Sequence, residues 1–347
     1  MMAPMDTDPR YSIPVPAKLP IWLRWMNGGP AWRRSVLRLA ARSRTLRRLA
    51  RHVQSIDTAS VAKHYAAEVD RFNAQMRSLG VRDIERYYWY HVVDLPGGIT
   101  TPGMYDYRGT VGCFGFPADM RGTSVLDVGS ATGFFAFEFE RRGAEVVAVE
   151  LPGLDQLDRF PGQDTGVLLR KIERMMTPLP ADKAPGLPRG YSAEEMYYYL
   201  LEAPFQLCCR LLGSRVERRF SSVYELSPQR LGRAGFDVVF AGDILVHTLR
   251  PFDALTALAG VCAGTLVIAQ AIPGSPSDPP AMLYEGGETP GDDCISWWLP
   301  NEQCFKQLLR KLGFAEVVAV GNHEGIHRPA GNIFSRRILH AKRVGTA

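Results

Sequence analysis

Apolar residues recur along this chain with two spacings, one typical of buried strands and one typical of amphipathic helices. Between residues 123 and 150, an apolar run at 125–128 is followed by a turn of small residues and a segment with helical spacing. A second apolar run then ends at Glu150. Upstream, apolar residues three and four positions apart over 58–79 predict a helix that packs against the rest of the fold.

The turn at 129–133 and the acid at 150 constrain what this unit binds. Gly129 and Gly133 allow a tight turn that brings a ligand against main-chain N–H groups, and the first turn of the next helix presents unpaired donors. Glu150, about 20 residues further on at a strand end, is placed to accept hydrogen bonds from both hydroxyls of a ribose. The unit predicts an adenosine-containing cofactor, and the alternative is a turn without a ligand.

Two adenosine cofactors compete for this unit, a dinucleotide and S-adenosylmethionine (SAM). The dinucleotide fingerprint G-x-G-x-x-G is incomplete, because Ala131 stands at its middle glycine. Asp127 lies at the end of the first strand, where a carboxylate would repel a pyrophosphate but could hold the amino group of a methionine moiety. We therefore expect SAM.

The stretch 123–150 resembles motif I of class I SAM-dependent methyltransferases, and later segments resemble that family in the same order. Residues 220–226 are similar to its third strand and loop, 236–247 to its fourth strand and loop, 265–270 to its fifth strand, and 300–320 to its last helix and a strand. The resemblance covers most of the chain, from about residue 85 to 342. It implies an α/β fold with a mainly parallel seven-stranded sheet and helices on both faces.

The resemblance also implies which residues surround the cofactor. Asp127 and Glu150 would bind the methionine amino group and the ribose, and the Arg108 guanidinium suits the methionine carboxylate. Val223 and Tyr224 would contact the adenine. The remaining cofactor residues expected from the resemblance are Gly129, Ser130, Gly133, Leu151, Gly242 and Asp243.

A narrower resemblance precedes motif I. Residues 89–91, 94–96 and 101–108, together with 297–313, resemble methyltransferases related to the enzymes that carboxymethylate the wobble uridine of tRNA. Those enzymes carry a Lys-Gly-Pro-Phe segment, and a tyrosine before the histidine of the fourth-strand loop, where this chain has Val246. Burying the extra carboxylate of carboxy-SAM without such partners would cost several kcal/mol. Ordinary SAM is therefore expected.

Methyl transfer by in-line SN2 displacement requires an aligned acceptor, and a base if the acceptor is a hydroxyl or an amine. His247, after the fourth strand, and His91 are the candidate bases, with Asp94 and Asp243 as orienting groups. In the competing interpretation, His247 bonds the backbone of its loop and His91 caps the cofactor pocket.

Two segments extend the core. About 70 residues separate Glu150 from residue 220, which predicts an insertion at about 152–202, with helix over 191–212. The insertion could form a lid or substrate wall carrying Tyr197, Tyr198 and Tyr199, or these tyrosines could pack it on the core. The long loop 271–295 could line the acceptor pocket too, because ligands in such folds bind outside the carboxyl ends of the strands.

The first 84 residues differ in charge from the predicted cofactor domain at 85–347. No acid lies between Asp8 and Asp57, and arginines interleave with leucines over 24–51, which predicts a basic amphipathic helix or helix pair. It could dock on the catalytic domain, bind an RNA backbone or contact an anionic membrane. The net charge of +5 is modest for 347 residues and argues against extensive nucleic-acid wrapping.

The overall composition bears on the size of the core, on the cellular location and on metal binding. With 46% hydrophobic residues the chain can build a sizeable core, and it has no transmembrane-length apolar run or signal-peptide pattern, which favours the cytoplasm. The six cysteines lack metal-ligand spacing, so no metal site is expected. The sequence favours a SAM-dependent methyltransferase with a small-molecule acceptor. The alternatives are a tRNA wobble-uridine methyltransferase and a non-catalytic SAM-binding protein.

Overall fold

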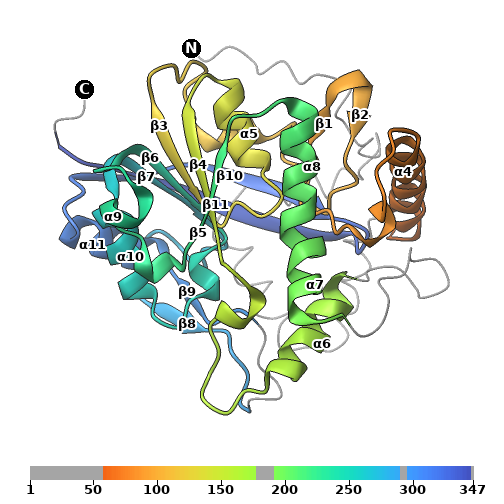
Figure 1. Ribbon diagram of the computed structural model, residues 1–347. Helices are drawn as coiled ribbons and strands as arrows, with labels where there is room; N and C mark the ends of the chain where they lie inside the picture. The colour runs from red at the N-terminus through yellow and green to blue at the C-terminus, as the bar shows by residue number, and fades with distance from the viewer. Residues whose placement is uncertain (1–57, 177–190, 290–294, 345–347) are drawn as a thin grey trace, which may run out of the picture.

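A seven-stranded sheet forms the centre of the computed structural model, which describes residues 58–176, 191–289 and 295–344 (Figure 1). The strand order is β10-β11-β7-β6-β3-β4-β5. The strands are β3 (Ser124–Val128), β4 (Glu145–Glu150), β5 (Glu217–Phe220), β6 (Phe236–Gly242), β7 (Cys262–Gln270), β10 (Glu316–His327) and β11 (Asn332–Lys342). Strands β3 to β7 are parallel, and β11 is antiparallel to both of its neighbours. The predicted α/β fold with a mainly parallel seven-stranded sheet is confirmed.

Helices cover both faces of the sheet, because its strands are apolar on both sides. Val125 contributes to the core on one face, and Leu126 and Val128 contribute to the core on the other. Figure 1 shows the helices of both layers. The first core includes residues of α4 (Thr58–Ser78), α5 (Phe134–Arg141) and α8 (Ala203–Leu212), and the second includes residues of α9 (Pro228–Leu231), α10 (Pro251–Gly260) and α11 (Glu302–Lys311).

The helix expected at 58–79 is present as α4 and packs on the sheet-containing core. Phe72 and Met76 lie in the first core, and the Phe72 ring meets the Trp89 ring edge-on with centroids 5.0 Å apart. At the C-terminal hairpin, Arg328 Nη1 donates to Glu68 Oε2 at 2.7 Å. The predicted basic segment at 24–51 lies outside the described residues, so its partner stays a prediction.

The turn after β3 requires glycine at two positions. Gly129 has a φ of +74°, and a Cβ there would lie 2.9 Å from Ile244 Cδ1. Gly133 has a φ of +92°, and a Cβ there would lie 2.5 Å from the Phe137 ring. Because other residues adopt these φ values only with strain, both glycines are needed for the turn that leads into α5.

The segment between β4 and β5 is mostly helical. It contains the 3-10 turn η5 (Leu154–Gln156), α6 (Thr165–Met176), α7 (Ala193–Tyr197) and one turn of π-helix, η6 (Tyr198–Glu202), which leads into α8. Leu154, Leu168, Ile172 and Met196 share a small core with residues of the segment before β3, Tyr88 and Met104. The insertion therefore packs against the lead-in, which is the aromatic-rich segment 84–114 before β3.

Short elements connect the main helices and strands, and one of them changes the expected loop at 271–295. The lead-in contains η2 (Ile84–Arg86), η3 (Pro96–Gly98), η4 (Val111–Phe114) and the paired strands β1 (Asp94–Leu95) and β2 (Ile99–Thr100). The loop expected at 271–295 includes β8 (Met282–Tyr284), which pairs with β9 (Trp298–Pro300). The segment 220–226, expected to hold the third strand and its loop, contains the end of β5 and the 3-10 turn η7 (Val223–Glu225), and a second 3-10 turn, η8 (Leu245–His247), follows β6.

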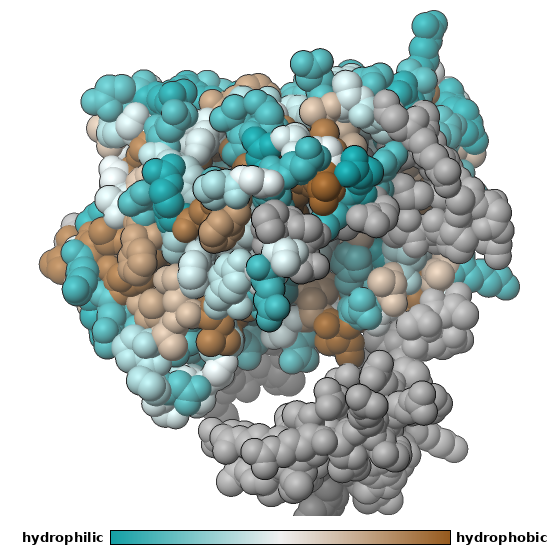
Figure 2. All heavy atoms as spheres, turned by 90° about the horizontal axis from the view of Figure 1, so that it is seen from below, coloured by the Kyte–Doolittle hydropathy of each residue, from teal (hydrophilic) through white to brown (hydrophobic). Residues whose placement is uncertain are grey.

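The surface seen from below mixes polar and apolar residues, and its apolar side chains lie in several separate groups (Figure 2). Among the described helices, none combines the length and the apolar character needed to cross a bilayer.

Candidate functional site

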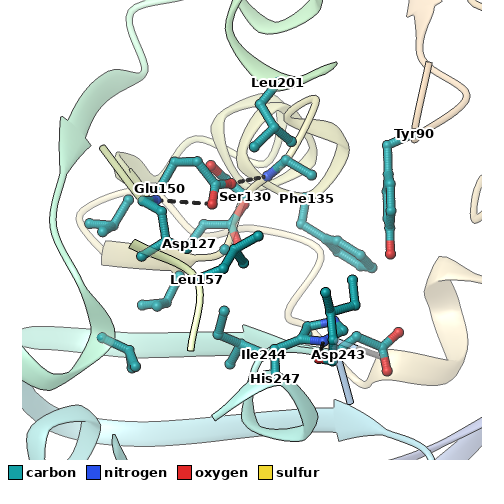
Figure 3. A pocket seen from close by; sticks show the side chains of 18 of the residues that line it. Tyr90, Asp127, Ser130, Phe135, Glu150, Leu157, Leu201, Asp243, Ile244 and His247 are labelled. Carbon is teal, nitrogen blue, oxygen red and sulfur yellow. Dashed lines mark hydrogen bonds between the residues drawn. The ribbon is translucent and has the colours of Figure 1, made fainter. Parts of the chain in front are cut away.

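A cavity of about 230 Å³ opens beyond the carboxyl ends of β3, β4 and β6. The turn at 129–131 forms its floor on one side, and residues of the insertion and of the lead-in complete its walls. In Figure 3, Asp127 and Glu150 lie at one end of the cavity and Tyr90 lies at the other, with Asp243 and His247 on a third side.

Most residues singled out from the sequence meet at this cavity. Those that line it are His91, Asp127, Gly129, Ser130, Glu150, Leu151, Val223, Tyr224, Gly242, Asp243 and His247. Gly133 lies behind them, where it begins helix α5 as its N-cap.

Asp127 is a buried carboxylate with an unused oxygen. The residue is 2% exposed, and its Oδ2 atom has no hydrogen-bond partner among the described residues. Burial, reinforced by the nearby charge of Glu150, raises the pKa of Asp127 to about 7. Because an unpaired buried carboxylate is costly, this position suits a cationic group of a ligand.

Glu150 serves the turn and the cavity together. Its Oε2 accepts a hydrogen bond from the backbone N–H of Ala131 at 2.8 Å, and its Oε1 accepts one from the backbone N–H of Leu151 at 3.0 Å. A carboxylate has about four lone-pair sites, so each oxygen keeps acceptor capacity for a hydroxyl group. Glu150 therefore fits the ribose role expected from its position.

Beside Val223 and Tyr224, the cavity contains an acid that the sequence reasoning missed. Asp158 accepts hydrogen bonds from the Tyr224 hydroxyl and, at 2.6 Å, from the backbone N–H of Leu249. The Arg250 guanidinium lies 4.1 Å from the centre of the Tyr224 ring and covers it. Asp158 belongs to the insertion, which carries no motif, so only the fold brings it to this wall.

His247 has a defined orientation. Its Nδ1 atom hydrogen-bonds to the backbone carbonyl oxygen of Ile295, which can only accept. Nδ1 therefore carries the proton in the neutral ring, and Nε2 keeps a free lone pair. Burial lowers the pKa of His247, so the ring is neutral at pH 7.

Asp243 and Arg336 form an ion pair on the cavity wall. Arg336 Nε donates to Asp243 Oδ2 at 2.6 Å, and both side chains are less than one-fifth exposed. Asp243 has a φ of +51°, a strained conformation for a residue with a Cβ. Burial raises the pKa of Asp243, while Arg336 opposes that shift. Arg336 was missed because it comes from β11, for which the sequence offered no motif.

His91 is held among aromatic rings. Its ring contacts those of Tyr90, Tyr107, Phe134 and Phe135, and its Nδ1 atom has no hydrogen-bond partner among the described residues. Burial lowers the pKa of His91 to about 3. Such a ring stays neutral and is a weak proton acceptor, which favours His247 as the base.

The expected role of Arg108 is corrected by the structure. Its guanidinium is held by Asp106, at 2.7 Å and 2.9 Å, and by Asp94, at 2.6 Å, and Arg108 is not among the residues that line the cavity. Two carboxylates of the lead-in, those of Asp94 and Asp106, therefore bind the Arg108 guanidinium at the same time. Arg108 therefore stabilises the lead-in instead of reaching the methionine end of the cavity.

The three tyrosines of the insertion divide between the two roles considered for them. The Tyr197 hydroxyl donates to the Leu151 carbonyl at 2.6 Å and its side chain lines the cavity, together with Leu200 and Leu201. Tyr199 is buried and contacts the Tyr87 and Tyr191 rings, whereas Tyr198 is 42% exposed. The insertion thus forms a cavity wall and also packs on the lead-in.

No group of His, Cys, Asp and Glu within the described ranges 58–176, 191–289 and 295–344 could hold a metal ion.

The sequence matches no protein-family model and no curated protein. Among solved structures, the chain is similar to the N-terminal domain of EvdMO1 with SAH bound (14% identity, 79% of this chain, 97% of that chain, TM-score 0.43). It is also similar to magnesium protoporphyrin IX methyltransferase from Synechocystis PCC 6803 with bound SAM (13% identity, 65% and 71% covered, TM-score 0.36). A third is 1,6-didemethyltoxoflavin-N1-methyltransferase from Burkholderia thailandensis with bound 1,6-didemethyltoxoflavin and SAH (17% identity, 65% and 72% covered, TM-score 0.37).

Proposed function

We propose that this protein is a SAM-dependent methyltransferase that acts on a small, largely apolar molecule. The observation that carries the proposal is the placement of two buried acids, Asp127 and Glu150, at one end of a cavity that is also lined by His247, whose Nδ1 is bonded to the Ile295 carbonyl. Residues 85–347 would form the cofactor domain, with residues 1–84 as an extension.

The residues present fit SAM at the end of the cavity formed by the turn. The unused oxygen of Asp127 would accept from the methionine ammonium, and Glu150 would accept from the ribose hydroxyls. Val223 and Tyr224 would pack on the adenine, and Asp158 lies beside them. SAM supplies an activated methyl group on a sulfonium.

The charge of the cavity wall favours a cationic cofactor and a small acceptor. Four carboxylates line it, those of Asp127, Glu150, Asp158 and Asp243, whereas Arg336 is the one arginine or lysine among the described lining residues. Arg336 is already paired with Asp243. SAM carries a net charge of +1, so the acidic wall attracts it, while the phosphates of an RNA would be repelled. This is our reason for preferring a small molecule over the tRNA alternative.

The acceptor would occupy the aromatic end of the cavity. Tyr90, Tyr107, Phe114 and Phe135 line this end, and burial raises the pKa of Tyr90 and Tyr107, so both hydroxyls stay neutral donors. Rings of this kind cover an apolar acceptor and exclude water. The hydroxyl groups of Tyr90 and Tyr107 would each be available to donate a hydrogen bond to a polar atom of the acceptor.

His247 would remove the proton of the acceptor. The hydrogen bond to Ile295 fixes the ring so that Nε2 can accept a proton from a hydroxyl or an amine. The resulting imidazolium would be stabilised by Asp243, whose charge raises the pKa of His247 against the effect of burial. After the transfer, the proton would leave to solvent when the cavity opens.

Two experiments test this proposal. Isothermal titration with SAM measures whether the protein binds it, and incubation of the protein with methyl-labelled SAM and a cell extract locates the product. Label in the small-metabolite fraction supports the proposal. Label that is lost on ribonuclease treatment would replace it with the tRNA alternative, and SAM binding with no labelled product in any fraction would favour the non-catalytic alternative.

A further inference from the structure

The loop that faces the cofactor end contains a strained residue. Ala131 has a φ of +46°, a left-handed conformation that glycine adopts freely and that a residue with a Cβ adopts only with strain. Ala131 lines the cavity, so its conformation sets the direction of the backbone groups around it. Something in the surrounding structure must hold this residue in place.

Two charged side chains hold Ala131 from opposite sides. Its N–H donates to Glu150 Oε2 at 2.8 Å, and its carbonyl accepts from Arg218 Nη1 at 3.1 Å. The same Nη1 atom donates to the Ser130 hydroxyl oxygen at 2.9 Å. Arg218 therefore bonds two consecutive residues of the loop with one nitrogen.

Arg218 is itself fixed by the insertion. The side chain is 8% exposed and its Nε lies 3.3 Å from Glu202 Oε2, at the end of the π-helical turn. Its guanidinium carbon also lies 4.0 Å from the centre of the Phe205 ring, on helix α8. Because a buried guanidinium is costly unless it is paired, these contacts keep Arg218 against the loop.

We propose that Arg218 is a positioning residue that holds the 129–131 loop in its cofactor-binding conformation, and that Glu202 couples this function to the insertion. The proposal rests on the proposed function, because it assigns the effect to SAM affinity. The wall residues Tyr197, Leu200 and Leu201 belong to the same helical segment as Glu202. A shift of this segment would therefore change the loop through Arg218.

The chain offers a matched control on the same strand. Arg219 follows Arg218 in β5, so its side chain leaves the opposite face of the sheet. Its guanidinium bonds Glu217 and the Arg230 carbonyl, and it does not line the cavity. Arg219→Met thus removes the same charge and volume from the same strand without touching the loop.

SAM titrations on four proteins test the proposal. We expect Arg218→Met to weaken SAM binding about tenfold or more, and Arg219→Met to change it less than about twofold. Adding Ala131→Gly to Arg218→Met should recover at least about threefold in affinity, because glycine keeps the left-handed conformation without the hydrogen bonds. A general loss of structure would not be rescued by that second change.

Glu202→Gln tests the coupling. It should weaken SAM binding by itself and add nothing in the Arg218→Met background, because both changes act through one contact. Independent, additive effects would overturn the role of Glu202.

A second measurement does not depend on SAM. Hydrogen exchange of the amides at 129–133 should be faster in Arg218→Met than in Arg219→Met, whether or not a cofactor is bound. If Arg218→Met proves unfolded by circular dichroism, Arg218→Lys replaces it in every comparison. A folded Arg218→Met variant that keeps the SAM affinity and the exchange rates of the wild type would overturn the role of Arg218 and leave the proposed function standing. Failure of the wild-type protein to bind SAM would overturn the proposed function, with the exchange data still reporting on the loop.

Discussion

The carboxylate of Glu150 accepts a hydrogen bond from the backbone N–H of Ala131 at 2.8 Å. The acid that we assign to the ribose therefore also holds the loop 129–131, which faces the proposed cofactor. Strand β4, which carries Glu150, pairs in parallel with β3, which leads into that loop. Removing this carboxylate therefore acts on the cofactor site in two ways, by losing an acceptor and by loosening a strained turn.

Glu150→Gln should weaken SAM binding by about tenfold or more, because an amide offers one acceptor atom where the carboxylate offers two. Glu145→Gln is the matched control, since Glu145 begins the same strand and its side chain is 76% exposed. Titration calorimetry on both variants measures the difference. Equal affinities for the two variants would contradict the ribose assignment.

Asp127→Asn should raise stability above neutral pH and lower SAM affinity. The pKa of Asp127 is raised to about 7 in the folded protein from an ordinary value of 3.8, so its contribution to wild-type stability is lost as the pH rises through that interval. At pH 8 the asparagine variant should be more stable by roughly 2–4 kcal/mol, and below pH 4 the difference should vanish.

Loss of the Asp127 proton should raise SAM affinity, although it lowers the stability of the free protein. Wild-type SAM affinity should rise between about pH 6 and 8 as the carboxyl group loses its proton and can pair with an ammonium, whereas Asp127→Asn should lack this rise. Urea unfolding and SAM titration across this range give both curves. A wild-type affinity independent of pH would show that Asp127 does not meet the cationic group.

His247→Asn should lower kcat by roughly two to four orders of magnitude for a hydroxyl or amine acceptor. The asparagine amide can still donate to the Ile295 carbonyl, so the loop and the SAM affinity should remain near wild type. The acidic limb of the kcat profile, which falls below the ordinary histidine pKa of 6.5, should disappear as well. His340→Asn provides the control, because His340 also bonds a backbone carbonyl, that of Phe114, and does not line the cavity. An unchanged kcat in His247→Asn would leave this histidine a purely structural role.

His323→Phe should make the protein less sensitive to acid. His323 is 1% exposed, contacts the Tyr107 and Phe334 rings, and has no hydrogen-bond partner for either ring nitrogen within the described residues. Burial lowers its pKa to about 4, so the wild type loses stability as the pH falls from 6.5 toward 4. Urea unfolding should show a gain of about 2 kcal/mol at pH 5 beyond any gain at pH 8. A constant difference between the two pH values would contradict this explanation.

Local patterns predicted the parts of the site that are contiguous in sequence. The strand, turn and acid of residues 123–150 predicted that Asp127, Gly129 and Glu150 lie near one another, and all three line the same cavity because parallel neighbouring strands bring their carboxyl ends together. His247 likewise follows from its place after β6.

The remaining site residues depend on contacts between distant segments. Arg336 reaches the cavity because β11 lies beside β7, and Asp158 reaches it through its contacts with Tyr224 and Leu249. Arg108 was misplaced for the same reason, since its charge suited a carboxylate and only the structure shows that Asp94 and Asp106 already occupy it. The charge of a side chain predicts what it can bind, and its neighbours in space decide whether it is available.

The strand order of the sheet also determines at which point of synthesis each strand can pair with its neighbours. Ser124 of β3 bonds Asp237 of β6, which follows 113 residues later, so β3 gains its second neighbour only after the whole insertion has been synthesised. At the far edge, β10 joins the sheet only through β11, which follows it in the chain. A nascent chain that has not reached Asn332 therefore has an unpaired β10, an open edge on β7 and an Asp243 without Arg336. Strand β11 therefore completes both this edge of the sheet and the ion pair on the cavity wall.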